Sequence, residues 1–147
     1  MYNEQILDQI LEGTLQNNQN HLCGTYKGFH VTINKYAYML RVRISAIHSD
    51  HHEINQLEKF LTEQIRTQKH LISASLEKHN ISLNIKSPIM KKAVPEHLNS
   101  NILPIISYLD QHRFVSGCMD CGKNTSELTC EEIHFEYFYL CESCKNK

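Results

Sequence analysis

The sequence predicts an α+β fold, a two-layer sandwich in which helices cover one face of an antiparallel sheet, with a zinc-ribbon-like finger at the C-terminus. Two regions contain paired runs of alternating apolar and polar residues, the pattern of half-buried hairpins. Three regions repeat apolar residues at helical spacing. Four cysteines near the C-terminus form two C-x-x-C pairs. We therefore expect the order α-ββ-α-ββ-α, with the α+β domain over residues 1–113 and the finger over 114–147.

Length and composition agree with one ordinary domain, or with a small domain and a metal finger, because 41% of the 147 residues are hydrophobic. The 15 basic and 16 acidic residues give a formal net charge of −1, which provides no electrostatic reason for general nucleic-acid binding. No apolar run approaches the roughly 18 residues of a membrane-spanning helix, and the N-terminus lacks the features of a signal peptide. We expect a cytoplasmic protein, or the cytosolic part of a longer one.

The first helix is expected over residues 3–12, where apolar residues recur at helical spacing before Gly13. A hairpin follows it. Apolar and polar residues alternate over 29–33 and again over 38–44, with a turn at Asn34-Lys35. One face of this hairpin is apolar and the other is polar, so we expect the sheet to be covered on one side only.

The strongest helical pattern begins near residue 50. Ser49 or Asp50 can cap its N-terminus, and Glu53 places an acidic side chain in the first turn, where the helix dipole favours it. The apolar stripe of this helix consists of Ile54, Leu57, Leu61 and Ile65, with Phe60 beside them.

A second hairpin is expected around residues 78–80, because apolar and polar residues alternate over 72–76 and over 81–85. A helix that continues through Leu76 is the alternative. The last helix begins at Pro95, a residue that suits a helix start. Because Pro104 lies inside it, we expect a kink or a break into two short helices, with Asn101 as the cap of the second.

The C-terminal cysteines carry the clearest chemistry in the chain. Nineteen residues separate the two C-x-x-C pairs, which is typical of a four-thiolate zinc site. Zn²⁺ prefers tetrahedral coordination by soft thiolates, and two residues between paired cysteines allow a tight turn to direct both sulfurs to one point. Four protein ligands leave no open coordination position, so the predicted site is structural rather than catalytic. The predicted ligands are Cys118, Cys121, Cys141 and Cys144.

Other interpretations of these cysteines remain open. The four could form disulfides, act as a redox dithiol, or bind iron in a rubredoxin-like site, which the spacing alone does not exclude. Cys130 and His134 lie within the finger and could compete as ligands. We expect Cys23 and Cys130 to be ordinary small, partly buried side chains. The segment 133–140, rich in β-branched and aromatic residues, should be the strand that leads to Cys141, with 125–130 as its partner.

Two tracts resemble a known family. Residues 24–34 (GTYKGFHVTIN), and residues 115–122 (VSGCMDCG) with 139–144 (YLCESC), are similar to the N-terminal cytosolic region of uncharacterised membrane proteins from Gram-positive bacteria. In that family a zinc-ribbon-like segment is followed by transmembrane helices, which this chain lacks. The resemblance spans nearly the whole chain and implies a position on the cytosolic side of a membrane, but no substrate.

These observations predict a non-enzymatic zinc-binding module that contacts a protein partner or a second copy of itself. The alternative is a nucleic-acid-binding regulator that uses the finger and a basic strand face formed by Arg41, Arg43 and Lys86. Residues 118–147 contain three basic and six acidic residues, so their net charge of −3 disfavours contact with phosphates. The sequence contains no phosphate-binding loop, dinucleotide fingerprint or nucleophile elbow.

Overall fold

The computed structural model describes residues 21–86 and 94–146. The helix predicted over 3–12 and the loop predicted over 87–93 lie outside the described residues. The elements, in chain order, are β1 (His21–Tyr26), β2 (Phe29–Lys35), β3 (Met39–Ser45), α2 (His51–Thr67), β4 (Leu71–Glu77), β5 (Asn80–Lys86), α3 (Val94–Gln111), β6 (Thr129–Ile133), β7 (Glu136–Leu140) and α4 (Glu142–Lys145).

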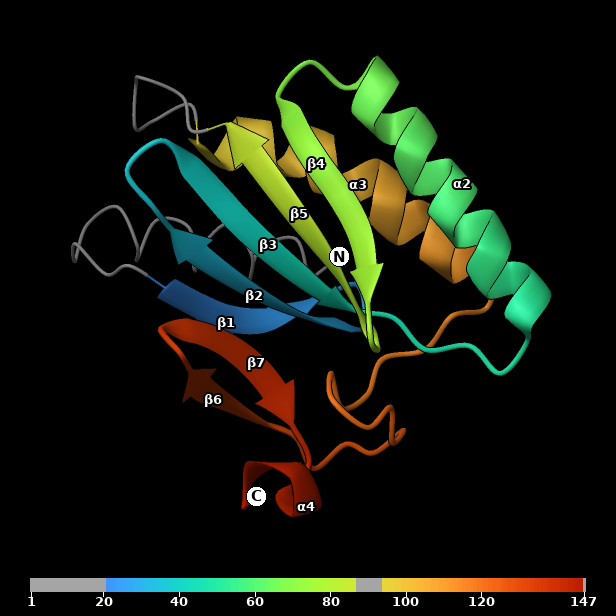
Figure 1. Ribbon diagram of the computed structural model, residues 1–147, viewed down its shortest axis with the longest axis vertical. Helices are drawn as coiled ribbons and strands as arrows, with labels where there is room; N and C mark the ends of the chain where they lie inside the picture. The colour runs from blue at the N-terminus through green and yellow to red at the C-terminus, as the bar shows by residue number, and fades with distance from the viewer. Residues whose placement is uncertain (1–20, 87–93, 147) are drawn as a thin grey trace.

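The main sheet is antiparallel and has five strands in the order β1-β2-β3-β5-β4 (Figure 1). Its two predicted hairpins are β2-β3 and β4-β5, joined where β3 pairs with β5. The predicted element order was wrong in one respect, because β1 adds a strand before the first hairpin. Lys27 and Gly28 form the two-residue turn between β1 and β2, both with positive φ, as in turns that match strand twist. Apolar and polar residues alternate too weakly over β1 for the sequence to predict a strand there.

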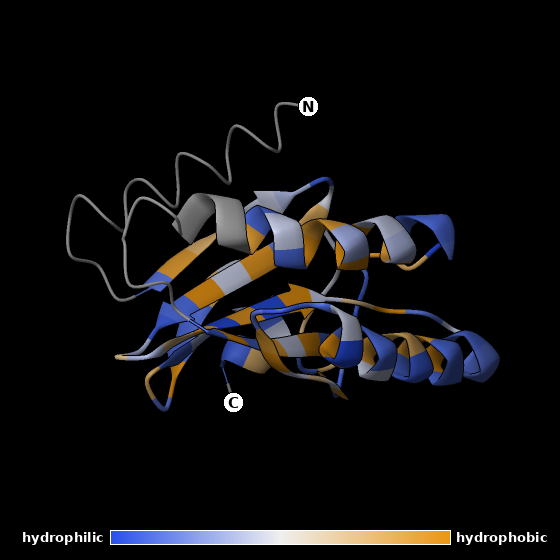
Figure 2. Cartoon of the chain, turned by 90° about the horizontal axis from the view of Figure 1, so that it is seen from above, coloured by the Kyte–Doolittle hydropathy of each residue, from blue (hydrophilic) through white to orange (hydrophobic). Residues whose placement is uncertain are grey.

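Helices α2 and α3 lie on the apolar face of the main sheet and share one hydrophobic core with it. Figure 2 shows apolar and polar residues alternating along the strands and recurring along the helices. The side chain of Asp50 accepts from the backbone N–H of His52, as the predicted cap of α2 requires. The ring of Phe60 on α2 stacks on Tyr108 of α3 with their centroids 4.0 Å apart. Central members of this core are Val42, Ile44, Leu57, Leu61, Leu83, Ile102 and Ile105.

Helix α3 is one continuous element that contains Pro104, so the expected break into two short helices does not occur. Asn101, expected as a cap, lies within the helix and is 2% exposed. An interior proline costs about 3 kcal/mol, whereas each fully buried aliphatic side chain contributes about 1.5–3 kcal/mol. The apolar stripe that offsets this cost consists of Leu98, Ile102, Ile105, Ile106 and Leu109, each 0% exposed.

Strands β6 and β7 form a separate two-stranded sheet. The strand predicted over 133–140 begins only at Glu136, because His134 and Phe135 form the turn with φ of 51° and 71°. Ile133 belongs to β6 and pairs with Glu136. Sequence patterns missed this turn because such two-residue turns usually carry asparagine, aspartate or glycine, and neither position does.

The β6-β7 hairpin covers part of the polar face of the main sheet, which we expected to be exposed. Side chains of β2 form hydrogen bonds with backbone groups of the hairpin, along the edge of β7 that does not pair with β6. The Thr32 hydroxyl donates to the Tyr137 carbonyl at 2.9 Å, and the Asn34 amide donates to the Phe135 carbonyl at 3.2 Å. The Tyr137 N–H donates in turn to Asn34 Oδ1 at 3.3 Å. The hairpin therefore stands on the sheet with β7 next to β2, on the side opposite the helices.

Candidate metal centre

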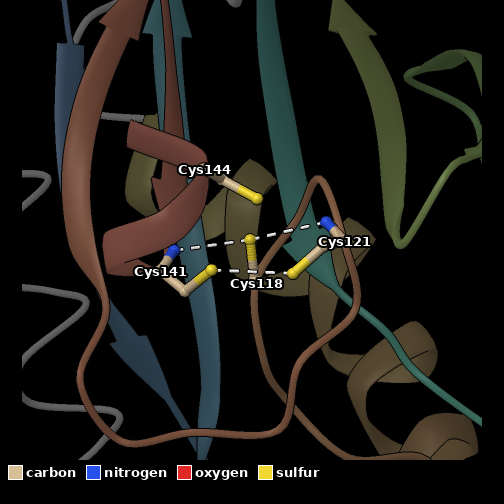
Figure 3. A group of neighbouring side chains, drawn as sticks. All are labelled: Cys118, Cys121, Cys141 and Cys144. Atoms are coloured by element: carbon tan, nitrogen blue, oxygen red, sulfur yellow. Dashed lines mark hydrogen bonds between the residues drawn. The ribbon is translucent and has the colours of Figure 1, made fainter. Parts of the chain in front are cut away.

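The four predicted cysteines lie together in the structure, and their Sγ atoms are all within 4.8 Å of one another. Cys121 Sγ and Cys141 Sγ are 3.6 Å apart. In a tetrahedral thiolate site with metal–sulfur distances of about 2.3 Å, neighbouring sulfurs lie about 3.8 Å apart. Figure 3 shows the four side chains directed toward one another from two segments of the chain. This geometry fits a single bound metal ion.

The first pair occupies a tight loop between α3 and β6. Cys118 N–H donates to the Lys123 carbonyl at 2.9 Å, and Gly122 N–H donates to the Cys118 carbonyl at 3.0 Å. Gly122 has a φ of +79°, and a Cβ there would lie 2.8 Å from the ring of His79. A glycine is therefore required immediately after the second cysteine, in agreement with the turn expected from the sequence.

The second pair lies where β7 meets α4. Cys141 follows the last residue of β7 and is the N-cap of α4, and the N–H of Cys144 donates to the Cys141 carbonyl at 3.1 Å. This single helical turn returns Cys144 to the cluster. The segments that carry the two pairs are also hydrogen-bonded to each other, because Met119 N–H donates to the Tyr139 carbonyl at 2.9 Å.

Backbone dipoles favour a thiolate at one of the four positions. The N–H groups of Cys121 and Cys141 point at Cys118 Sγ at 3.5 and 3.4 Å. Burial acts to raise the pKa of Cys118, but these N–H groups and that of Asp120 outweigh it and lower the pKa to about 6. Burial, together with the neighbouring sulfurs, raises the pKa of Cys144. Metal binding must therefore displace protons from the cluster.

The alternative ligands considered from the sequence are not part of the cluster. Cys130 is bonded to Cys23, and His134 lies in the β6-β7 turn. Cys118, Cys141 and Cys144 are buried and only Cys121 is exposed, and all four are free thiols rather than disulfides. A metal ion bound by all four sulfurs would have a full tetrahedral set of protein ligands, which is the arrangement of structural sites.

A disulfide between Cys23 and Cys130 links β1 to β6, contrary to the expectation that both were ordinary side chains. The two residues are 107 positions apart, with a Cα–Cα distance of 6.5 Å. Only the two leftover cysteines hinted at this link in the sequence, because the pairing depends on how the hairpin sits on the sheet. Beside it, the His21 ring stacks on Tyr137 with centroids 3.6 Å apart.

The basic strand face expected on β3 is largely neutralised within the molecule. Arg41 and Arg43 form ion pairs with Glu136 on β7 at 3.0 and 2.9 Å, and Arg43 is only 6% exposed. Burial acts to raise the pKa of Glu136, but the two guanidinium groups lower it below its ordinary value. Lys86 is exposed at the end of β5. The basic strand face considered as an alternative is therefore reduced, because Arg43 is buried and both arginines are paired with Glu136.

The metal-site loop is anchored to the end of β3. The Ser45 hydroxyl donates to the Gly117 carbonyl at 2.7 Å and accepts from the Gly117 N–H at 2.8 Å. A Cβ on Gly117 would lie 2.5 Å from the backbone carbonyl oxygen of Lys123, so this close approach needs glycine. Lys78 also forms an ion pair with Asp120 beside the cluster.

The fold and the site define an α+β protein with a four-cysteine candidate metal centre held on the polar face of its sheet. No family model matches the chain, and neither the curated proteins nor the solved structures contain a significant match to it. Among the described helices, none combines the length and the apolar character that crossing a membrane requires.

Proposed function

We propose that the protein is a non-enzymatic zinc-binding module, in which one ion holds the β6-β7 hairpin in place and so completes a surface for a protein partner. The observation that carries this proposal is the convergence of four thiol sulfurs within 4.8 Å of one another. Tetrahedral sites with four sulfur ligands are typical of structural zinc, which contributes folding free energy to segments that lack a core of their own.

Zinc is favoured over iron because nothing about the proposed role needs a change of oxidation state. Both metals accept four thiolates in a tetrahedron, so donor type alone does not separate them. Iron in such a site gives visible absorption and zinc gives none, which allows the purified protein to distinguish the two.

A protein partner, or a second copy of the chain, is favoured over nucleic acid by the charges around the finger. Arg41 and Arg43 already pair with Glu136. The total formal charge of residues 118–147, Glu136 included, is −3, which repels a phosphate backbone. The nucleic-acid alternative therefore has no specific contact in its favour.

We place this module in the cytoplasm, on the cytosolic side of a membrane if the family resemblance holds. Free thiolates persist as metal ligands in a reducing compartment. The same conditions would favour thiols at Cys23 and Cys130, so that the metal centre becomes the main link between the finger and the sheet.

The test is elemental analysis of the reduced, freshly purified full chain, with Cys121→Ser and Ser143→Ala as a matched pair. Ser143 is exposed and lies between two ligands without belonging to the cluster. We expect about one zinc per chain in the wild type and in Ser143→Ala, and loss of that zinc in Cys121→Ser. Amide NMR signals of residues 114–146 should broaden in Cys121→Ser, while those of the main sheet stay dispersed.

Wild-type protein without stoichiometric metal would contradict the proposal. Visible absorption with one iron per chain would replace zinc by iron. Retention of zinc in Cys121→Ser would show that the ligand set is wrong.

A further inference from the structure

The β6-β7 hairpin divides the polar face of the sheet into a filled side and an open side. Side chains alternate along the strands, so paired residues share one face of the hairpin. On the filled side, the ring of Tyr139 lies 4.6 Å from that of His30, and Cys130, its pair on β6, is bonded to Cys23. On the open side, Phe138 is the residue whose ring faces β3.

A cavity of about 670 Å³ occupies this open side, between the hairpin, the β3-β5 part of the sheet and the metal-site loop. We call it the wedge, and the lining residues that matter here are Arg43, Asn80, Met119, Glu131, Ile133 and Phe138. Sites for small ligands and short segments commonly measure about 300–1,000 Å³, so the wedge is large enough to hold several side chains.

The walls of the wedge combine apolar and polar side chains. The Arg43 guanidinium lies over the Phe138 ring at 4.5 Å and also donates to Asn80 Oδ1 at 3.1 Å, so these three side chains contact one another across the wedge. Of the apolar lining residues, Ile133 is 41% exposed and Met119 is buried. Covering the apolar part of this surface with an apolar side chain is favourable, because it removes apolar area from water.

The charge that remains in the wedge is negative. Three cations line it, and each has a carboxylate partner: Arg43 pairs with Glu77, Lys78 with Asp120, and Lys145 with Glu142. Two further lining carboxylates, Glu131 and Glu132, take part in no ion pair with the described residues. An occupant that brings a positive charge beside an apolar group would complement this surface.

We propose that the wedge is a docking site for a basic, apolar-flanked peptide segment of a partner protein. An arginine or lysine of the segment pairs with Glu131, which shares the open face of the hairpin with Phe138, and Glu132 adds negative charge from the neighbouring position. A neighbouring aliphatic side chain lies against Ile133 and Phe138. This inference rests on the proposed function, because the metal-held loop and hairpin form two walls of the wedge. Removing the metal should therefore abolish the site.

The experiment is a ¹⁵N NMR titration of the metal-loaded full chain with the peptide acetyl-Leu-Arg-Leu-Arg-amide. The acidic peptide acetyl-Leu-Glu-Leu-Glu-amide serves as the matched probe. We expect the basic peptide to change the amide chemical shifts of β6, β7 and Met119. The acidic peptide should leave these chemical shifts unchanged. Ile133→Ser should weaken the binding while the metal content stays unchanged.

Two double variants test the charges. Glu131→Gln with Glu132→Gln should weaken binding of the basic peptide roughly tenfold, because the carboxylate on the open face and the neighbouring negative charge are both lost. Glu58→Gln with Glu63→Gln removes the same charge from exposed positions of α2, on the other layer, and should leave the affinity unchanged.

Absence of shifts in fully metal-loaded protein would overturn this inference and leave the zinc proposal standing. Equal shifts by both peptides, or equal weakening by both double variants, would also overturn it, since the binding would then be unspecific. Shifts in β6 and β7 that depend on protein concentration without peptide would assign the wedge to a second copy of the chain instead. Protein that carries no metal fails the earlier proposal, which the elemental analysis of the same sample reveals.

Discussion

The two faces of the main sheet are covered in different ways. On the apolar face, α2 and α3 bury a continuous core that includes Val42, Leu83 and Ile102, all 0% exposed. On the polar face, the β6-β7 hairpin is held by side-chain hydrogen bonds from Thr32 and Asn34, by ion pairs, by a disulfide and by the cysteine cluster. The alternation of apolar and polar residues along the strands thus creates two unlike surfaces, and each is covered by a different kind of contact.

This difference also determines which of the two covers is stable from apolar burial alone. A buried aliphatic side chain contributes about 1.5–3 kcal/mol, whereas a hydrogen bond contributes a net 0.5–1.5 kcal/mol, about a third to a half as much. The finger has a small cluster of its own, in which three of the four buried residues are the cysteines Cys118, Cys141 and Cys144. Its attachment therefore depends on links that do not rely on apolar area.

The largest effect is expected on the helix-covered face. Ile102→Ala removes a fully buried side chain of α3 and should lower the free energy of unfolding by about 2–5 kcal/mol, because it loses apolar burial and leaves a cavity. Chemical denaturation measures this change. Glu58→Ala, at an exposed position of α2, should stay within about 0.5 kcal/mol of the wild type. A cost below about 1 kcal/mol for Ile102→Ala would show that this core does not dominate stability.

A smaller effect is expected from the link between β1 and β6. Cys23→Ser with Cys130→Ser opens a loop of 107 residues and should lower the free energy of unfolding by about 2–4 kcal/mol under oxidising conditions. A mild reductant should bring the wild type to the stability of the double variant and leave that variant unchanged. If the two proteins unfold at the same denaturant concentration before reduction, the disulfide does not hold the hairpin.

The smallest effect is expected from Glu136→Gln, which leaves the buried Arg43 beside an uncharged amide. We expect a loss of about 1–3 kcal/mol at neutral pH. Because the pKa of Glu136 is lowered in the folded state, its contribution is present above the ordinary carboxyl pKa. The contribution disappears as the pH falls through the lowered pKa, so the gap between variant and wild type should close in acid. A gap that is constant with pH would contradict the role of this carboxylate.

Local patterns in the sequence were sufficient for most of the helix-covered face. The stripe of α2 with its Asp50 cap and the strands of the hairpins β2-β3 and β4-β5 follow from spacing and cap chemistry. The turn predicted at Asn34-Lys35 was misplaced, because both residues belong to β2 and the chain reverses between Lys35 and Met39. The same approach missed β1, whose residues alternate weakly, and the turn at His134 and Phe135, which carries none of the usual turn residues. It also expected a break at Pro104, where burial of the surrounding helix outweighs the lost backbone bond.

The sequence by itself determined the α+β class and the four cysteines of the candidate centre, because strand alternation, helical spacing and C-x-x-C turns are all properties of short segments. Only the tertiary structure decided what covers the polar face. The Cys23–Cys130 bond, the pairing of Arg41 and Arg43 with Glu136, and the wedge beside Phe138 all join residues far apart in the chain. Contacts of this kind depend on the relative placement of two sheets, which no local pattern encodes.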